Sequence, residues 1–124
     1  MKITVILVRS LMGLLFLFSS ITFLFKLITP PPPTGAMKTF SDGLAASVYL
    51  MPTVKIIELT CGLAFLSGRF VPLASILIAP IIINILLVHA FLGPQGLPLA
   101  IFLVLANGLL AYHHRDSYKP LFKA

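Results

Sequence analysis

The sequence predicts an all-α membrane protein with four transmembrane helices in a bundle. The first observation is composition: 59% of the 124 residues are hydrophobic, only 10% are charged, and the mean hydropathy is +1.09. Such values exclude an ordinary soluble domain. The second is that apolar stretches of roughly 20 residues, the length that crosses a bilayer as a helix, recur along the chain. The third is that the basic residues flank these stretches, as topology signals do.

The apolar stretches divide the chain into four spans within a single domain over residues 1–124. The first span has Lys2 and Arg9 towards one end and Lys26 at the other, where long side chains can reach the membrane surface. Its Gly13 and Ser20 share one helical face, which predicts close packing against another helix. The expected spans are about 5–28, 53–68, 70–92 and 97–113.

The segment between the first two spans predicts a stiff loop and a short helix. Pro30 to Pro33 are four consecutive prolines, which lack amide donors and favour an extended conformation. Ser41 then has the chemistry of a helix N-cap, with Asp42 in the first turn of a helix that runs to about Leu50. Pro52 should interrupt the chain before the second span.

Interior residues of the later spans suggest how the helices pack. Pro80 should kink the third helix, because it frees a carbonyl one turn earlier. Asn107 and Gly108 in the fourth span are predicted to mediate helix packing. Cys61 is the only cysteine, which excludes an internal disulfide and favours an inert buried side chain.

Charge asymmetry predicts the orientation of the chain. With four spans both termini lie on one side, together with six basic residues, whereas three lie opposite. The positive-inside rule therefore places both termini in the cytoplasm. The six are Lys2, Arg9, Arg69, Arg115, Lys119 and Lys123, and the three are Lys26, Lys38 and Lys55.

Glu58 is the main candidate for a functional residue. It lies in an apolar span, where a buried acid is costly unless it has a partner or a function. Lys55 precedes it by three residues, close enough on a helix to form an ion pair. Two interpretations remain equal: a structural pair, or a proton-accepting group and ligand anchor.

Polar residues of two other spans are predicted to approach the same level of the bundle. At about 1.5 Å per residue, Glu58 lies roughly 8 Å below the outer boundary, with Ser20 and Asn84 somewhat deeper and His89 shallower. Asn84 also suits an interhelical hydrogen bond, and His89 suits an interfacial position, since five residues separate the two by about 140° around the helix. The predicted ligand-binding residues are Glu58, Lys55, Asn84, His89 and Ser20.

Several stretches together resemble the DoxX-like family of small bacterial four-helix membrane proteins. They are GLLFLFSSITFLFK in the first span, the proline-rich loop, VKIIELTCGLAFLSGRFVPLASILIAPIIINILLVHAFL and the basic tail. The run from Arg69 to His89 is the most specific part, whereas Ser20 stands where a glycine is usual. The resemblance implies a bundle in the bacterial inner membrane. It also implies a link to membrane oxidoreductases and quinol oxidases.

Two hypotheses for the function follow. In the first, the protein is a quinone-interacting accessory component of a membrane oxidoreductase, whose electron carrier belongs to a partner subunit. In the second, it is a non-catalytic membrane module that binds a lipid-like ligand or stabilises a partner membrane protein. We expect no metal, since His113 and His114 lie too far from His89 to share a haem iron, and no cofactor in the chain other than a bound quinone. The basic residues flank the spans, so we expect no nucleic acid partner. The sequence leaves open whether the protein is an enzyme.

Overall fold

A computed structural model describes residues 2–27 and 32–123, and its ordered elements are helices. Four segments are long and apolar enough to cross a membrane, as the composition predicted. A short extra helix lies between the first and second of them, which confirms the all-α class. The long helices are α1 (Lys2–Leu24), α3 (Leu50–Ser67), α4 (Val71–Phe91) and α5 (Leu97–His113), the last preceded by the 3-10 turn η1 (Pro94–Gly96).

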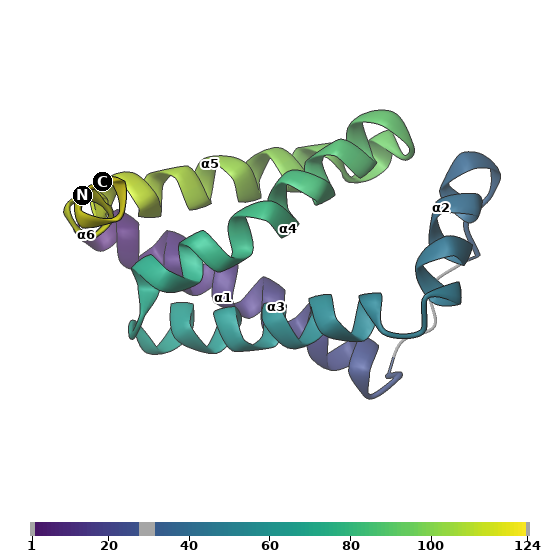
Figure 1. Ribbon diagram of the computed structural model, residues 1–124, viewed down its shortest axis with the longest axis horizontal. Coiled ribbons are helices and arrows are strands. Elements are labelled where there is room, and N and C mark those ends of the chain that lie inside the picture. The colour runs from purple at the N-terminus through teal and green to yellow at the C-terminus, as the bar shows by residue number, and fades with distance from the viewer. Residues whose placement is uncertain (1, 28–31, 124) are drawn as a thin grey trace.

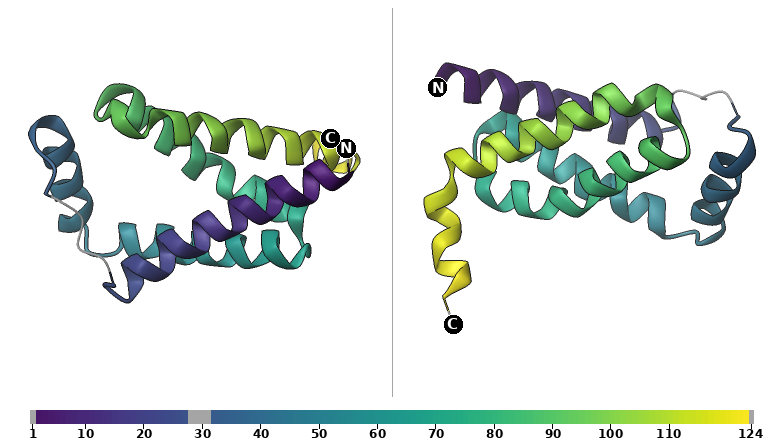
Figure 2. Two further views of the ribbon diagram at one scale, coloured as in Figure 1. Left: turned by 180° about the vertical axis from the view of Figure 1, so that it is seen from behind. Right: turned by 90° about the horizontal axis from the view of Figure 1, so that it is seen from above.

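The four long helices run up and down, so the two ends of the chain lie at the same end of the bundle (Figure 1). We call this the termini end, and the opposite end, where α2 stands, the α2 end. Helix α1 packs mainly on α3, while α4 packs on both α5 and α3. Figure 2 shows α1 crossing α3 at an angle and the C-terminal segment turning away from the axis of α5.

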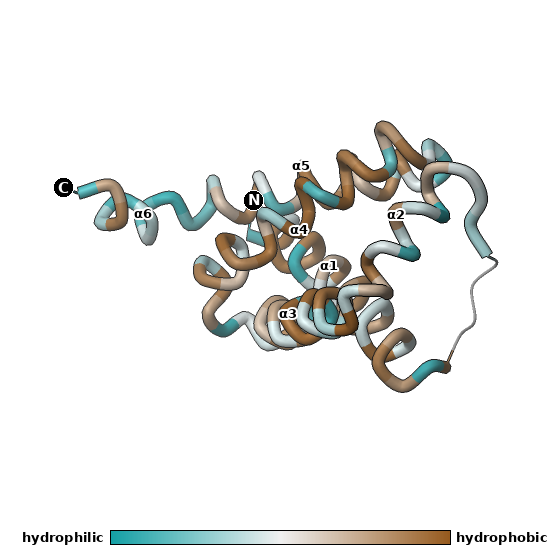
Figure 3. Tube along the Cα trace, turned by 45° about the vertical axis from the view of Figure 1, so that its right-hand side comes forward, coloured by the Kyte–Doolittle hydropathy of each residue, from teal (hydrophilic) through white to brown (hydrophobic). Residues whose placement is uncertain are grey.

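The interior of the bundle is apolar and contains few polar side chains. Phe16 of α1 and Phe65 of α3 meet with ring centroids 6.5 Å apart, and Met12, Ile78 and Leu110 are completely buried around them. Hydrophobic residues predominate along the long helices (Figure 3), and many of them are exposed, which suits a surface in contact with lipid. Exposed examples are Leu7, Leu14, Phe18, Leu63, Leu77, Ile83, Leu99 and Leu105.

Two glycines let α1 and α3 approach closely. A Cβ added to Gly62 would lie 3.1 Å from the Gly13 carbonyl oxygen, and one added to Gly13 would lie 3.0 Å from the Gly62 oxygen. The predicted packing face of the first span is therefore confirmed. The prediction for Gly108 is wrong, because this residue is exposed and a Cβ there would meet no atom within 4 Å. A small residue in a span does not by itself identify a contact.

Helix α2 (Gly35–Ala46) begins earlier than predicted. Thr34, not Ser41, occupies the N-cap position, and Ser41 lies inside the helix. The Lys38 ammonium lies 3.0 Å from the Asp42 carboxylate, an i,i+4 pair that requires both residues to be helical. The cap prediction was wrong because serine and aspartate near a helix start also fit a helix interior when a charge partner is available.

The helical conformation is interrupted between α2 and α3 at Val48, whose φ of 69° lies in the left-handed region. The Ser47 hydroxyl accepts a hydrogen bond from the Leu50 amide there. The interruption predicted at Pro52 therefore occurs earlier, at Val48. Pro52 lies in the first turn of α3, where its missing amide donor is not needed. Of the predicted stiff loop, Pro30 and Pro31 lie outside the described residues.

The C-terminal basic tail is folded. After α5 it forms α6 (Arg115–Tyr118) and the 3-10 turn η2 (Lys119–Phe122). The Tyr118 hydroxyl donates to the Pro72 carbonyl oxygen at 2.9 Å, which attaches this segment to the first turn of α4. This contact between distant segments was not predicted from the sequence.

Candidate functional site

Glu58 lies near the middle of α3, eight residues after Leu50 and nine before Ser67. Its side chain is only 4% exposed, and its Oε2 lies 3.2 Å from the Nζ of Lys55, whose side chain is 13% exposed. The predicted ion pair is therefore formed. Because α3 is a continuous helix, the three-residue spacing places Lys55 on the same face, one turn closer to the α2 end.

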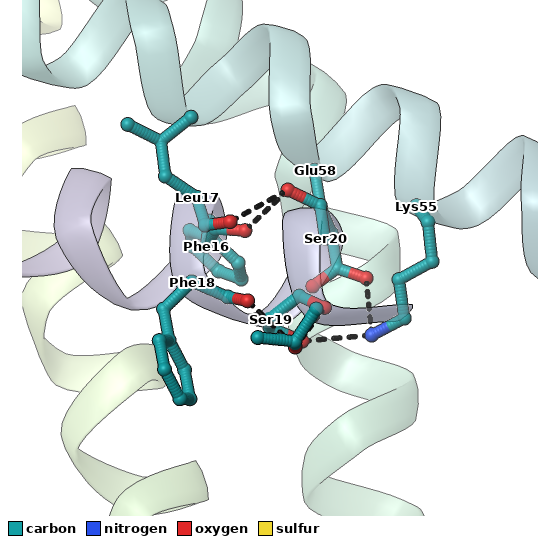
Figure 4. Close-up of polar contacts among 8 residues, drawn as sticks. Phe16, Leu17, Phe18, Ser19, Ser20, Lys55 and Glu58 are labelled. Carbon is teal, nitrogen blue, oxygen red and sulfur yellow. Dashed lines mark hydrogen bonds and ion pairs between the residues drawn. The ribbon is translucent and has the colours of Figure 1, made fainter. Parts of the chain in front are cut away.

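Helix α1 completes the cluster through Ser19. The Lys55 ammonium donates to the Ser19 hydroxyl at 2.8 Å, as Figure 4 shows. The ammonium also lies 5.6 Å from the centre of the Phe23 ring. We call Ser19, Lys55 and Glu58 the acid–base cluster, which links α1 to α3.

The predicted site residue Ser20 is buried beside this cluster but has a different role. Its hydroxyl donates to the Phe16 carbonyl oxygen at 2.7 Å, within its own helix. Ser20 was predicted as a site residue from its depth in the membrane, close to that of Glu58, and its side chain is indeed buried. The neighbouring Ser19 contacts Lys55 instead. The pair of adjacent serines therefore marked the right turn of α1, but the wrong serine of the pair was predicted.

The two predicted residues of α4 lie elsewhere on the bundle. Asn84 is exposed on the outer surface of its helix. His89 lies towards the α2 end, where its Nδ1–H donates to the Ile85 carbonyl oxygen at 2.8 Å and its ring packs over Gly96 of η1. Among the described residues, neither side chain hydrogen-bonds to the acid–base cluster.

The charges of Lys55 and Glu58 compensate each other, and Lys55 has one N–H group without a partner among the described residues. A lysine ammonium has three N–H groups, and in the described part of the chain Lys55 has two hydrogen-bonding partners, Glu58 and Ser19. The third N–H can serve a ligand that carries an acceptor, such as a carbonyl oxygen. Glu58 keeps the ammonium charge compensated in an apolar setting, where an unpaired charge would be costly.

Cys61 lies one turn from Glu58 and belongs to the core. Its side chain is 1% exposed, and the thiol lies 3.7 Å from the Ala74 carbonyl oxygen of α4. This is the inert buried position expected for it. It contributes to the contact between α3 and α4.

The fold and cluster define a multi-pass membrane protein, a four-helix bundle with an acid–base pair held among apolar helices. The DoxX family model matches residues 4–90, which span α1 to nearly the end of α4. The chain therefore belongs to the DoxX family. Helix α5 and the C-terminal segment lie outside the matched region. No match is found among curated proteins or among solved structures.

Proposed function

We propose that this protein is a quinone-interacting component of a membrane oxidoreductase, with the acid–base cluster as the contact for the quinone headgroup. The observation that supports the proposal is the remaining N–H donor of Lys55, next to a carboxylate and within an apolar bundle. A quinone carbonyl is an acceptor on an apolar ring with an apolar tail. It therefore fits a membrane site that offers a donor and apolar walls.

The same residues can handle the protons of quinone chemistry. Reduction of a quinone to a quinol consumes two electrons and two protons. In the proposal a partner subunit supplies the electrons, while Lys55 and Glu58 exchange protons with the ring oxygens. Because Lys55 lies on the α2 side of Glu58, exchange with water is expected from the α2 end of the bundle.

The other predicted ligand contacts stay predictions within this proposal. Ser20 is committed to its own helix, so it would line the site without donating to the ligand. Asn84 and His89 would have to meet a tail or a second ring substituent, because they do not bond to the cluster.

Binding of a quinone analogue to the purified protein in lipid nanodiscs tests the proposal. Glu58→Gln should weaken binding about tenfold, because it removes the carboxylate that holds the donating Lys55 ammonium in place, and it should change the pH dependence of binding. Thr60→Val is the matched control, because Thr60 is exposed on the same helix. Equal binding to the parent and Glu58→Gln at every pH would contradict the quinone role.

A second candidate function is a non-catalytic module that stabilises a partner or holds a lipid-like ligand. The close approach of Gly13 and Gly62 beside the acid–base cluster favours it, since both features fasten α1 to α3. Under this candidate the cluster affects stability only. The nanodisc experiment then gives no saturable quinone binding to the parent protein or to Lys55→Ala, and Lys55→Ala lowers stability.

We also propose the bacterial inner membrane as the location, with both termini in the cytoplasm. The support is the asymmetry of six basic residues against three, together with the position of both termini at one end of the bundle. Reporter fusions at positions 69 and 124 should be active in the cytoplasm, and one at position 36 outside. A cytoplasmic reporter at position 36 would reverse the orientation.

A further inference from the structure

A groove lies at the termini end, between α4, α5 and the C-terminal segment, on the side of α4 that does not face α3. Its volume is about 380 Å³, which suits a ring with part of a tail. Its walls are almost entirely apolar, with Ile76, Pro80 and Ile83 from α4 and Leu121 and Phe122 from η2. Part of the groove therefore comes from segments beyond the region that the DoxX model matches.

Two buried polar side chains line this groove, Ser75 of α4 and Asn107 of α5. Ser75 is 2% exposed and Asn107 is 9% exposed. The Asn107 Nδ2 donates to the Ser75 backbone carbonyl oxygen at 3.2 Å, which confirms the predicted packing role of Asn107 and fixes the orientation of its amide. The Oδ1 of Asn107 has no hydrogen-bonding partner among the described residues, and the Ser75 hydroxyl lies near the Tyr118 hydroxyl without a well-aligned hydrogen bond to it.

The hydrogen-bonding capacity of these two atoms specifies what they can receive. An amide oxygen only accepts, so Asn107 Oδ1 requires a donor. A serine hydroxyl both donates and accepts, so Ser75 can serve a group that acts as donor and acceptor at once. A hydroxyl meets both requirements, because it donates to Asn107 and accepts from Ser75. A carbonyl oxygen cannot donate to Asn107.

The chain already places a phenol next to these atoms. Tyr118 lines the groove beside Ser75, but its hydroxyl donates to the Pro72 carbonyl oxygen. The Tyr118 hydroxyl therefore does not donate to the Asn107 Oδ1. The position of Tyr118 shows that an aromatic ring with a hydroxyl fits at this level of the bundle, and Phe122 adds a second ring to the wall.

We propose that this groove is a second ligand site, which takes a membrane-soluble phenol whose hydroxyl bridges Ser75 and Asn107. The ring lies against Pro80 and Phe122, and the tail leaves towards the bilayer. Because the Asn107 Oδ1 and the Ser75 Oγ have almost no exposed surface, binding of the hydroxyl requires a small displacement of Tyr118, which also lines the groove. The site is independent of the acid–base cluster, and a quinol is one phenol that would qualify.

A photoreactive para-alkylphenol and its O-methyl ether, used with the protein in nanodiscs, test the proposal. The ether keeps the ring and tail but cannot donate to Asn107. We expect saturable labelling by the phenol at residues 75–83 and 118–122, with affinity about tenfold higher than for the ether. Equal affinity for the two probes, or labelling spread over the lipid-facing surface, would overturn the proposal.

Variants separate loss of the site from loss of the fold. Asn107→Leu should abolish the preference for phenol over ether, whereas Ser75→Ala should weaken the binding of both probes, since both oxygens can accept from the Ser75 hydroxyl. Ser67→Ala is the matched control, because it removes an exposed hydroxyl from α3 and should leave the affinity for both probes unchanged. Ala79→Leu should block labelling by filling the groove while leaving both polar residues in place. Full labelling of Ala79→Leu, or a preference that survives in Asn107→Leu, would contradict the assignment.

Discussion

The two polar regions of the bundle differ in what they leave unsatisfied. Between α1 and α3, the Lys55 and Glu58 charges compensate each other and Ser19 joins them, which leaves one N–H donor. Between α4 and α5, Asn107 donates one N–H to the Ser75 carbonyl oxygen, and its Oδ1 is left as an acceptor without a partner in a residue that lines the groove. A donor suits a carbonyl and an acceptor suits a hydroxyl. One small bundle can therefore offer chemically opposite sites at two levels of the membrane.

The two regions should also differ in how much free energy of unfolding is lost when their polar side chains are replaced. The acid–base cluster contains two buried charges, so loss of one partner leaves the other uncompensated. The groove contains neutral groups that are already incompletely paired, so their removal costs less. This contrast can be measured as free energies of unfolding in mixed micelles titrated with a denaturing detergent.

The largest effect is expected at Lys55. Lys55→Ala should lower the free energy of unfolding by about 3 kcal/mol, because Glu58 then stays buried without its cation. The double variant Lys55→Ala with Glu58→Gln should recover part of the loss, since neither residue is then charged. Additive losses in the double variant would mean that the two side chains do not interact.

The crossing of α1 and α3 gives the next largest effect. Gly62→Leu should cost about 2 kcal/mol, because its Cβ would meet the backbone of α1 at 3.1 Å and the longer side chain has no room. Gly108→Leu is the control and should change stability by less than about 0.5 kcal/mol, since that position is open. Equal losses in the two variants would show that the crossing is not tightly packed.

A smaller effect is expected in the groove. Asn107→Leu loses one hydrogen bond to the Ser75 carbonyl oxygen but also removes the partnerless Oδ1. The net change in the free energy of unfolding should stay within about 1 kcal/mol. A loss as large as that of Lys55→Ala would mean that the main role of Asn107 is to stabilise the fold. It would contradict the expected difference in stability between the two regions.

The smallest effect concerns His114, just beyond α5. Burial, His113 and the Arg9 guanidinium lower the pKa of this imidazole below its ordinary value. Protonation therefore favours the unfolded chain, and the contribution of His114 to stability is lost as the pH falls below the ordinary histidine pKa of about 6.5. An NMR titration of the ring should give a lowered pKa that rises in Arg9→Gln. A pKa at or above the ordinary value would contradict the assignment.

The features that could be predicted from the sequence depend on composition or on near neighbours. The four spans follow from long apolar stretches, and the Lys55–Glu58 pair follows from helical spacing. The Gly13 face follows from periodicity. Each of these signals lies within a single helix, so no knowledge of how the helices pack was needed.

The missed features depend on packing between distant segments. Whether Ser19 or Ser20 reaches Lys55 depends on the rotation of α1 against α3, and one residue changes that direction by about 100°. The groove needs α4, α5 and the C-terminal segment together, and the contact of Tyr118 with Pro72 joins residues far apart in the chain. The packing prediction for Gly108 was wrong because residue type alone does not show whether a position faces outward.

The most direct test of the two opposite sites is a cross-competition experiment with one protein and two photoreactive probes. In nanodiscs, a benzoquinone probe should label α1 and α3 around Ser19 and Lys55, and an alkylphenol probe should label the groove around Asn107. Each unlabelled ligand should displace its own probe at concentrations about tenfold lower than it displaces the other. Both probes at one region, with equal cross-competition, would contradict a donor site and an acceptor site in the same bundle.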